Sequence, residues 1–412
     1  MRNSIIEGST AIVSQNLDLI KKVFLRIDDG YFTEVRERNP HNRQRYVCYK
    51  GNNLVVIPGL INAHTHLGDS FAKDIEIDKS LNELIHPLTG LKYKLLDSVT
   101  ESLIVKSMRD SALDMLRCGV TTFADFREGG KKGVILLKRA LKGVKIRALI
   151  LGRPNYYFDE EEVLKNSPMS DEKFHEVEEV LKICDGLGLS GPNEYTDQSM
   201  KELSRLVDGK KLLAIHVCED RCSVDFSLKN FHQSEVKRAL KNNNLDFLVH
   251  LTHPRNEDLK LVTKAKVPVV CCPRANSILG CGFPPINSMI KSGITVALGT
   301  DNVMFSSIDL FREMDFTSRM LRALEREPSK ISSKEIMKMA TINAAKALKL
   351  DKEIGSIEEG KRADAVFINM GTRNLKSVKN TINAIVHRVR PDDIQAVMVG
   401  GEIVYGSLPK YS

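Results

Sequence analysis

Short runs of alternating or β-branched apolar residues fill the first 57 residues of the chain. These runs are Ser4–Val13, Val23–Ile27, Phe32–Val35 and Leu54–Ile57. Asp28-Asp29-Gly30 and the polar stretch Arg38–Arg45 separate them, as turns separate strands. The pattern predicts part of a small β-domain.

From Pro58 onwards, apolar strand-like runs alternate with longer helical patterns. The alternation begins with Glu101–Leu116, Thr121–Asp125, Val134–Leu141 and Ile146–Leu151. It is typical of right-handed βαβ units and a parallel sheet. Further strand candidates are Gly186–Leu189, Leu212–His216, Phe247–His250, Val267–Cys272 and Thr295–Gly299. With Val56–Ala63 counted first, about eight strands emerge, which predicts an α/β fold of the (β/α)8 TIM-like barrel type.

Beyond a helical pattern at Ser333–Leu348, the chain returns to short strand-like runs. These are Ala365–Ile368, Ala384–Arg388, Ala396–Val399 and Ile403–Tyr405. We therefore expect residues 1–57 and 356–412 to form one small β-sandwich-like domain, and residues 58–355 to form the barrel.

The composition is that of an ordinary globular protein, with 412 residues, 42% of them hydrophobic and 28% charged. A net charge of +8 without a dense basic block argues against a nucleic-acid partner.

The N-terminus lacks a signal-like apolar core, and the longest apolar runs are too short to span a bilayer. We expect a cytoplasmic protein without a membrane partner, whose eight cysteines, with no Cys-x-x-Cys pair, are reduced thiols.

Polar residues follow several predicted strands at the end where barrel enzymes build their sites. They are His64-Thr65-His66, His216 with Glu219, His250, and Asp301. Residues two apart in a strand point the same way, so His64 and His66 can reach one metal ion. Taken singly, each histidine could be a core residue and Asp301 could cap a helix. Together they form a nitrogen and oxygen donor set that suits Zn²⁺ or Fe²⁺.

Such a metal ion lowers the pKa of a bound water toward neutrality. Glu219 and His250 are then available to transfer protons and to polarise the substrate.

The chain resembles the amidohydrolase superfamily, in the branch that contains cytosine, guanine and adenosylhomocysteine-type deaminases and triazine hydrolases. The motifs that carry this resemblance are Pro58-Gly59-Leu60-Ile61-Asn62-Ala63-His64-Thr65-His66, His216-x-x-Glu219, His250, Cys272-Pro273-Arg274-Ala275-Asn276, Gly299-Thr300-Asp301, Ala340-Thr341-Ile342-Asn343-Ala344-Ala345 and Gly355-Ser356-Ile357-Glu358-Glu359-Gly360-Lys361-Arg362-Ala363-Asp364. They are spread over nearly the whole chain.

The resemblance implies that His64, His66, His216 and Asp301 hold a single divalent metal ion, zinc first and iron second. Glu219 would carry the proton from the attacking water to the departing nitrogen, and Asp301 would share the deprotonation. His250 would polarise the substituent of the attacked carbon. Binuclear relatives use a lysine at the end of the fourth strand, and residues 186–192 contain none, which favours one metal ion.

One stretch departs from the purine-type pattern. Purine deaminases of this branch tend to carry Pro-His-x-Pro-Tyr after the fourth strand, where the histidine contacts the substrate. Here the corresponding stretch is Gly191-Pro192-Asn193-Glu194-Tyr195, which has no histidine. The sequence therefore gives less support to an adenosine-like substrate.

Further candidates for substrate binding are Arg153, Arg274 and Asn276, although either arginine could instead be structural. With Lys73 and Lys92, the two arginines lie in predicted site loops, which raises the hypothesis of an anionic substituent on the substrate.

The sequence thus predicts a mononuclear metal-dependent aminohydrolase that deaminates a small nitrogen heterocycle. The alternatives are hydrolysis of a cyclic amide or of a chloro- or alkylamino-substituted ring, and a non-catalytic binding protein on the same fold. The expected partners are a small-molecule substrate and copies of the same chain in a homo-oligomer.

Overall fold

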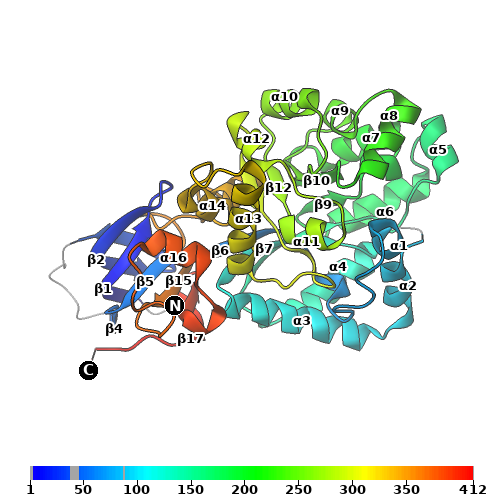
Figure 1. Cartoon of the computed structure of the whole chain (residues 1–412). Coiled ribbons are helices and arrows are strands. Elements are labelled where there is room, and N and C mark those ends of the chain that lie inside the picture. The colour runs from blue at the N-terminus through cyan, green and yellow to red at the C-terminus, as the bar shows by residue number, and fades with distance from the viewer. Residues whose placement is uncertain (1–2, 38–45, 87–88, 412) are drawn as a thin grey trace.

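A computed structural model describes residues 3–37, 46–86 and 89–411. The predicted polar turn at Arg38–Arg45 lies outside these residues. Figure 1 shows a larger body of strands and surrounding helices beside a smaller sheet, to which both the first and the last segments of the chain contribute.

The larger body is a parallel sheet that curls into a barrel. Its order is β13-β12-β11-β10-β9-β8-β7-β6-β14. The strands are β6 (Leu60–His66), β7 (Val120–Arg127), β8 (Arg147–Gly152), β9 (Gly186–Leu189), β10 (Leu212–Val217), β11 (Phe247–His250), β12 (Val269–Cys271), β13 (Val296–Leu298) and β14 (Asp301–Asn302). Only Gly299 and Thr300 separate β13 from β14, so these two strands are successive parts of one run. The predicted TIM-like barrel is confirmed.

Hydrogen bonds between β6 and the chain around β14 close the barrel. Asp301 pairs with Thr65 in parallel register. Just before this pair, the Asn62 amide donates to Thr300 Oγ1 over 2.8 Å and accepts from the Thr300 backbone N–H over 3.0 Å. Asn62 and Thr300 are fully buried. The Thr300 N–H also donates to the His64 carbonyl over 3.1 Å, so Thr300 is held from β6 by a side chain and by the backbone.

Helices cover the outside of the barrel and the ends of its strands (Figure 1). They are α1 (Leu81–Ile85), α2 (Leu91–Ser98), α3 (Glu101–Arg117), α4 (Gly130–Leu141), α5 (Glu160–Lys165), α6 (Asp171–Leu181), α7 (Asp197–Val207), α8 (Arg221–Phe231), α9 (Glu235–Asn242), α10 (Asn256–Ala265), α11 (Pro273–Ile278), α12 (Ile286–Lys291), α13 (Leu310–Glu325), α14 (Ser333–Met339) and α15 (Ile342–Ala347). Within the described residues, none of the helices is both long and apolar enough to cross a membrane.

The smaller sheet joins the two ends of the chain. Its order is β17-β16-β15-β5-β1-β2-β3, with β4 beside β1. The strands are β1 (Ser4–Val13), β2 (Asp18–Asp28), β3 (Tyr31–Arg36), β4 (Val47–Lys50), β5 (Leu54–Pro58), β15 (Ala365–Asn369), β16 (Ile394–Val399) and β17 (Glu402–Gly406). Because β5 pairs with β1 on one side and β15 on the other, the two segments form one sheet, as expected. The domain boundaries at residues 57/58 and 355/356 stay a prediction.

Two predicted elements in the last quarter of the chain were wrong. The expected strand at Ala384–Arg388 lies in a helix, α16 (Thr381–His387). Asn380 caps this helix by accepting from the Asn383 N–H, and the short apolar run is buried on one helical face. The expected single helix over 333–348 is two helices, because Thr341 leaves helical geometry. At this break the Ala340 carbonyl accepts a hydrogen bond from the Ile61 N–H of β6.

A phenylalanine fills the barrel interior beneath the strand ends. Phe126 of β7 is fully buried, and its ring centre lies 4.4 Å from that of His64 and 5.0 Å from that of His216. Gly188 of β9 makes room for it, since a Cβ there would lie only 2.5 Å from the Phe126 ring. The aromatic ring thus forms an apolar floor under a group of histidines.

Removing the Asn62 side chain should weaken the closure of the barrel. We expect Asn62→Ala to lower the free energy of unfolding by about 2 kcal/mol, because two buried hydrogen bonds are lost and the Thr300 hydroxyl loses the Asn62 amide as its donor. Urea unfolding at matched metal content measures the change. Asn244→Ala, at an exposed position, is the matched control. Equal stability of the two variants would contradict the assigned role of Asn62.

Candidate metal centre and active site

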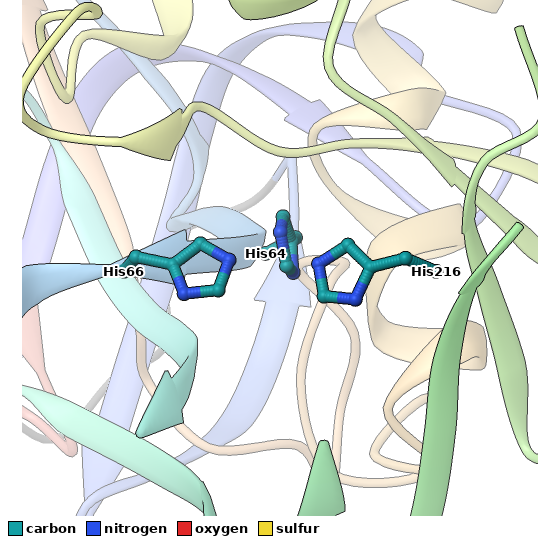
Figure 2. A group of neighbouring side chains, drawn as sticks. All are labelled: His64, His66 and His216. Carbon is teal, nitrogen blue, oxygen red and sulfur yellow. The ribbon is translucent and has the colours of Figure 1, made fainter. Parts of the chain in front are cut away.

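Three histidines converge at the carboxyl ends of β6 and β10. The ligand atoms of His64, His66 and His216 all lie within 4.8 Å of one another, and Figure 2 shows the three rings facing a common point. The closure of the barrel adds Asp301, whose Oδ1 lies 3.2 Å from His64 Nε2 and 3.5 Å from His66 Nε2. All four side chains are buried.

Hydrogen bonds orient two of these rings. Nδ1 of His66 lies 2.7 Å from Glu128 Oε1 and 3.1 Å from the Phe126 carbonyl, and Nδ1 of His216 lies 2.7 Å from the Leu189 carbonyl. Since Nδ1 must be the donor to such acceptors, Nε2 of each ring carries the free lone pair. The hydrogen bonds of His66 and His216 therefore determine that Nε2 is the nitrogen available to a metal ion in each ring.

Burial keeps His66, His216 and His250 in the neutral form, which is the form of imidazole that binds metals. It lowers the pKa of His66 to about 3 and that of His250 to about 4, and it lowers the pKa of His216 well below its ordinary value. Burial opposes ionisation of Asp301, but its hydrogen bond with His64 and the neighbouring histidines bring the pKa of this carboxyl below its ordinary value. At neutral pH, His66 and His216 therefore each offer a lone pair, and Asp301 offers a carboxylate.

The four residues fit one divalent metal ion. Their donors are three imidazole nitrogens and a carboxylate oxygen, a combination found around zinc and non-haem iron. His64 Nδ1 is buried and has no hydrogen-bond partner among the described residues. With its other nitrogen beside Asp301, this ring is not explained by protein hydrogen bonds alone, which supports a ligand role.

Glu219 and His250 lie next to this centre. Glu219 follows β10, and its Oε2 lies 3.4 Å from His250 Nε2. Burial, and then the negative charge of Asp301, raises the pKa of Glu219 well above its ordinary value. Asn276 holds the other nitrogen of His250, with its Nδ2 at 3.1 Å from Nδ1. A carboxyl of raised pKa therefore lies beside an imidazole that Asn276 holds in place.

The backbone is unusual at the same strand ends. Cys218, His250 and Asp301 adopt φ values of 50°, 71° and 63°, in the left-handed region that residues other than glycine rarely occupy. Hydrogen bonds from the Thr252 and His253 N–H groups to the Cys218 carbonyl, each 3.0 Å long, hold one of these turns. Backbone strain of this kind clusters at functional sites.

A buried charge network lies behind His66, and sequence reasoning missed its centre. Glu128 accepts hydrogen bonds from His66, Lys92 and Arg127, and Lys92 also lies 3.4 Å from Asp69. Burial opposes ionisation of Glu128, yet the surrounding positive charges hold its pKa well below the ordinary value. Glu128 directly follows β7, and a polar residue at the end of a strand is the same sequence signal that identified the other site residues.

The predicted substrate-binding residues lie in different environments. Arg153 lines the cavity next to the centre, and its guanidinium donates to Tyr93 Oη over 3.1 Å and to the Gly188 carbonyl over 3.2 Å. Asn276 stands behind His250. Arg274 instead donates to the Ser307 carbonyl and hydroxyl and pairs with Glu313 at 3.6 Å. Arg274 is not among the residues that line the cavity, and its role in substrate binding stays a prediction.

A cavity with about 680 Å³ of empty space opens over the candidate metal ligands. The walls contain two groups that the sequence did not single out as functional, Glu194 and Glu235. Burial raises the pKa of Glu194 to about 7 and that of Glu235 to about 8. The loop residue His86 also lines the cavity, whereas His253 bonds to the Cys281 carbonyl away from it.

Comparison with known proteins agrees with this geometry. A 5-methylthioadenosine/S-adenosylhomocysteine deaminase of Thermoanaerobacter pseudethanolicus is 30% identical over 400 residues, covering 94% of this chain and 89% of that protein. An uncharacterized protein of Methanocaldococcus jannaschii is 38% identical over 383 residues, covering 91% of this chain and 93% of that protein.

Among solved structures, the atrazine chlorohydrolase of Arthrobacter aurescens in complex with zinc superposes with a TM-score of 0.83. The match covers 98% of this chain and 96% of that chain at 20% identity, so it reports on the fold. The family model described as the amidohydrolase family matches residues 55–404. Because this match spans the barrel and well over half of the chain, the chain belongs to the amidohydrolase family.

Proposed function

We propose that the chain is a mononuclear metal-dependent aminohydrolase that releases ammonia from a small nitrogen heterocycle. The observation that carries this proposal is the proximity of Glu219, a partly buried glutamate whose pKa is raised, to the group of three histidines and Asp301. Deamination must protonate the departing nitrogen, and a carboxyl of raised pKa is suited to that task. The deaminase name of a relative at 30% identity supports the same reaction.

His64, His66, His216 and Asp301 would hold the metal ion, with zinc as our first choice and iron as the second. When bound, the ion supplies a water of lowered pKa as the nucleophile. The Phe126 floor keeps this end of the cavity apolar.

Glu219 would take the proton from the attacking water and deliver it to the departing amino group, with Asp301 sharing the deprotonation. The ring carbon gains an oxygen, the bond to nitrogen breaks, and ammonia leaves. His250 would donate from Nε2 to the substrate in the tautomer in which its Nδ1 accepts from the Asn276 amide nitrogen, 3.1 Å away. Arg153 would contact the far side of the ring from its position in the cavity wall.

Variants of the proposed ligands should lose the metal ion. We expect His216→Ala and Asp301→Ala to retain well below one equivalent of zinc, because each removes one of four donors. Inductively coupled plasma mass spectrometry of purified protein measures the content. His175→Ala, on an exposed face of α6, is the matched control. Full zinc retention in both variants would place the metal elsewhere.

Glu219→Gln separates proton transfer from metal binding. We expect this variant to keep its metal ion and lose about 100-fold or more in kcat, because the amide cannot carry the proton. Glu257→Gln, at an exposed position on α10, should retain the wild-type rate. Undiminished turnover in Glu219→Gln would remove its proposed role.

The reaction class is tested by the leaving group. Zinc-loaded protein is incubated with aminopyrimidines, aminopurines, aminopterins and chloro- and alkylamino-triazines, and ammonia, chloride and alkylamine are measured. We expect ammonia from at least one ring. Chloride or alkylamine without ammonia would favour the alternative hydrolase activity, and no product together with failure to load metal would favour a binding protein.

A further inference from the structure

The loop that follows β9 carries a carboxylate into the wall of the cavity. Glu194 ends the short helix η2 (Pro192–Glu194) and lines the cavity. Its Oε2 is buried and accepts no hydrogen bond from the described residues. Gly191 leaves the space for this oxygen, because a Cβ at that position would lie 2.8 Å from it. The local sequence therefore makes room for a buried acceptor without pairing it.

A second unpaired polar group lies four residues earlier. Ser190 is only 7% exposed, lines the same cavity, and its Oγ also has no partner among the described residues. The preceding residue, Leu189, provides the carbonyl that orients His216. Ser190 thus links the loop to the candidate metal centre. Buried polar groups without partners are costly. The carboxylate oxygen can only accept and the hydroxyl can also accept, so the two groups in one cavity wall point to a ligand that supplies N–H groups.

The protein does not neutralise Glu194 with an ion pair. Arg153 lines the same cavity and counteracts the effect of burial on the pKa of Glu194. Its guanidinium is directed instead to Tyr93 Oη and the Gly188 carbonyl. Within the described part of the chain, no ion pair of 4.0 Å or less involves Glu194, in contrast to Glu128, which is paired with Lys92 and Arg127.

The loop that carries Glu194 is rigidly held. Arg238 of α9 is fully buried, donates to the Pro192 carbonyl and to Asn193 Oδ1 over 2.9 Å each, and pairs with Asp197 at 2.9 Å. Its guanidinium also stacks 3.6 Å from the centre of the Phe231 ring. The unpaired state of Glu194 is therefore a feature of a fixed loop.

Glu194 lies where two cavities meet. The outer cavity is lined by aromatic side chains, among them Tyr157, Phe158 and Phe226. Both cavities share Asn82, His86, Glu194 and Ser223 in their walls. Two parts of a substrate can therefore reach Glu194. One is the edge of a ring that binds in the cavity beside the metal centre, and the other is a substituent that extends from this ring into the second cavity.

We propose that Glu194, together with Ser190, binds a basic nitrogen group of the substrate and so determines its specificity. The group is an amine or an amidine-type edge whose N–H bonds are directed at the Glu194 carboxylate. This inference rests on the proposed function in one respect, namely that the substrate ring binds in the cavity beside the metal centre.

Two pairs of compounds test the inference by isothermal titration calorimetry. The protein is zinc-loaded and carries Glu219→Gln, so that turnover does not disturb binding. For a ring edge, 2,4-diaminopyrimidine is compared with 4-amino-2-methylpyrimidine. For an outward substituent, 5′-amino-5′-deoxyadenosine is compared with adenosine. We expect the compound with the additional amine to bind about tenfold more tightly in at least one pair, as a charge-assisted hydrogen bond predicts.

Adding Glu194→Gln should reduce that preference to within about threefold while the zinc content stays the same. The matched control adds Glu161→Gln, whose side chain is 74% exposed on α5, and should keep the preference. If Glu194→Gln does not fold, Glu194→Asp, which withdraws the carboxylate by one methylene, should reduce the preference as well.

A lack of preference in both pairs, including a failure of all four compounds to bind, would overturn the inference. So would a preference that survives in the Glu194 variants. These outcomes concern binding alone, so they are distinguishable from failure of the proposed function, which is read from zinc content and ammonia release.

Discussion

The parallel pairing of β14 with β6 is the constraint on which the rest of the structure depends. Without it, Asp301 at one end of the sheet and His64 at the other would have no reason to meet, since 237 positions separate them. Closure places Asp301 opposite Thr65, between the two histidines of β6. The buried Asn62–Thr300 hydrogen bonds fix this register. A slip of one residue would turn the carboxylate away from the site. Closure of the barrel therefore also brings Asp301 to the histidines of β6.

The sequence predicted those features that follow from strong local periodicity. The alternation from Pro58 onward was enough for the barrel, because strands buried on both faces read as apolar runs. The hydrophobic pattern was insufficient where a short apolar run is compatible with both a strand and a helix. Ala384–Arg388 is such a run, and the cap from Asn380 favours the helix there. The pattern also missed the break at Thr341, which depends on a long-range hydrogen bond between Ile61 and the Ala340 carbonyl. Such partners are invisible to patterns read along the chain.

The site residues also fall into those that a local sequence pattern identifies and those that depend on contacts in the folded chain. The structure brings His64, His66, His216 and Asp301 together because each follows a strand, and strand ends meet at one edge of a barrel. Glu128 occupies an equivalent position after β7, but nothing in its local sequence distinguishes it from a helix-capping acid. Glu194 was harder to identify. Its importance comes from the absence of a Cβ at Gly191 and from the lack of a partner for one oxygen, and both are properties of the folded chain.

Charge at the site differs from the net charge of +8 for the whole chain. Of the four cations that raised the hypothesis of an anionic substituent, Lys73 is exposed, Lys92 is paired with Glu128 and Asp69, and Arg274 is paired with Glu313. Arg153 alone remains in the cavity wall without an ion pair among the described residues. Against it stand the carboxyls of Glu194, Glu219, Glu235 and Asp301. Carboxyl oxygens accept hydrogen bonds whether or not they are ionised, so this lining favours a ring that presents N–H groups to the cavity wall.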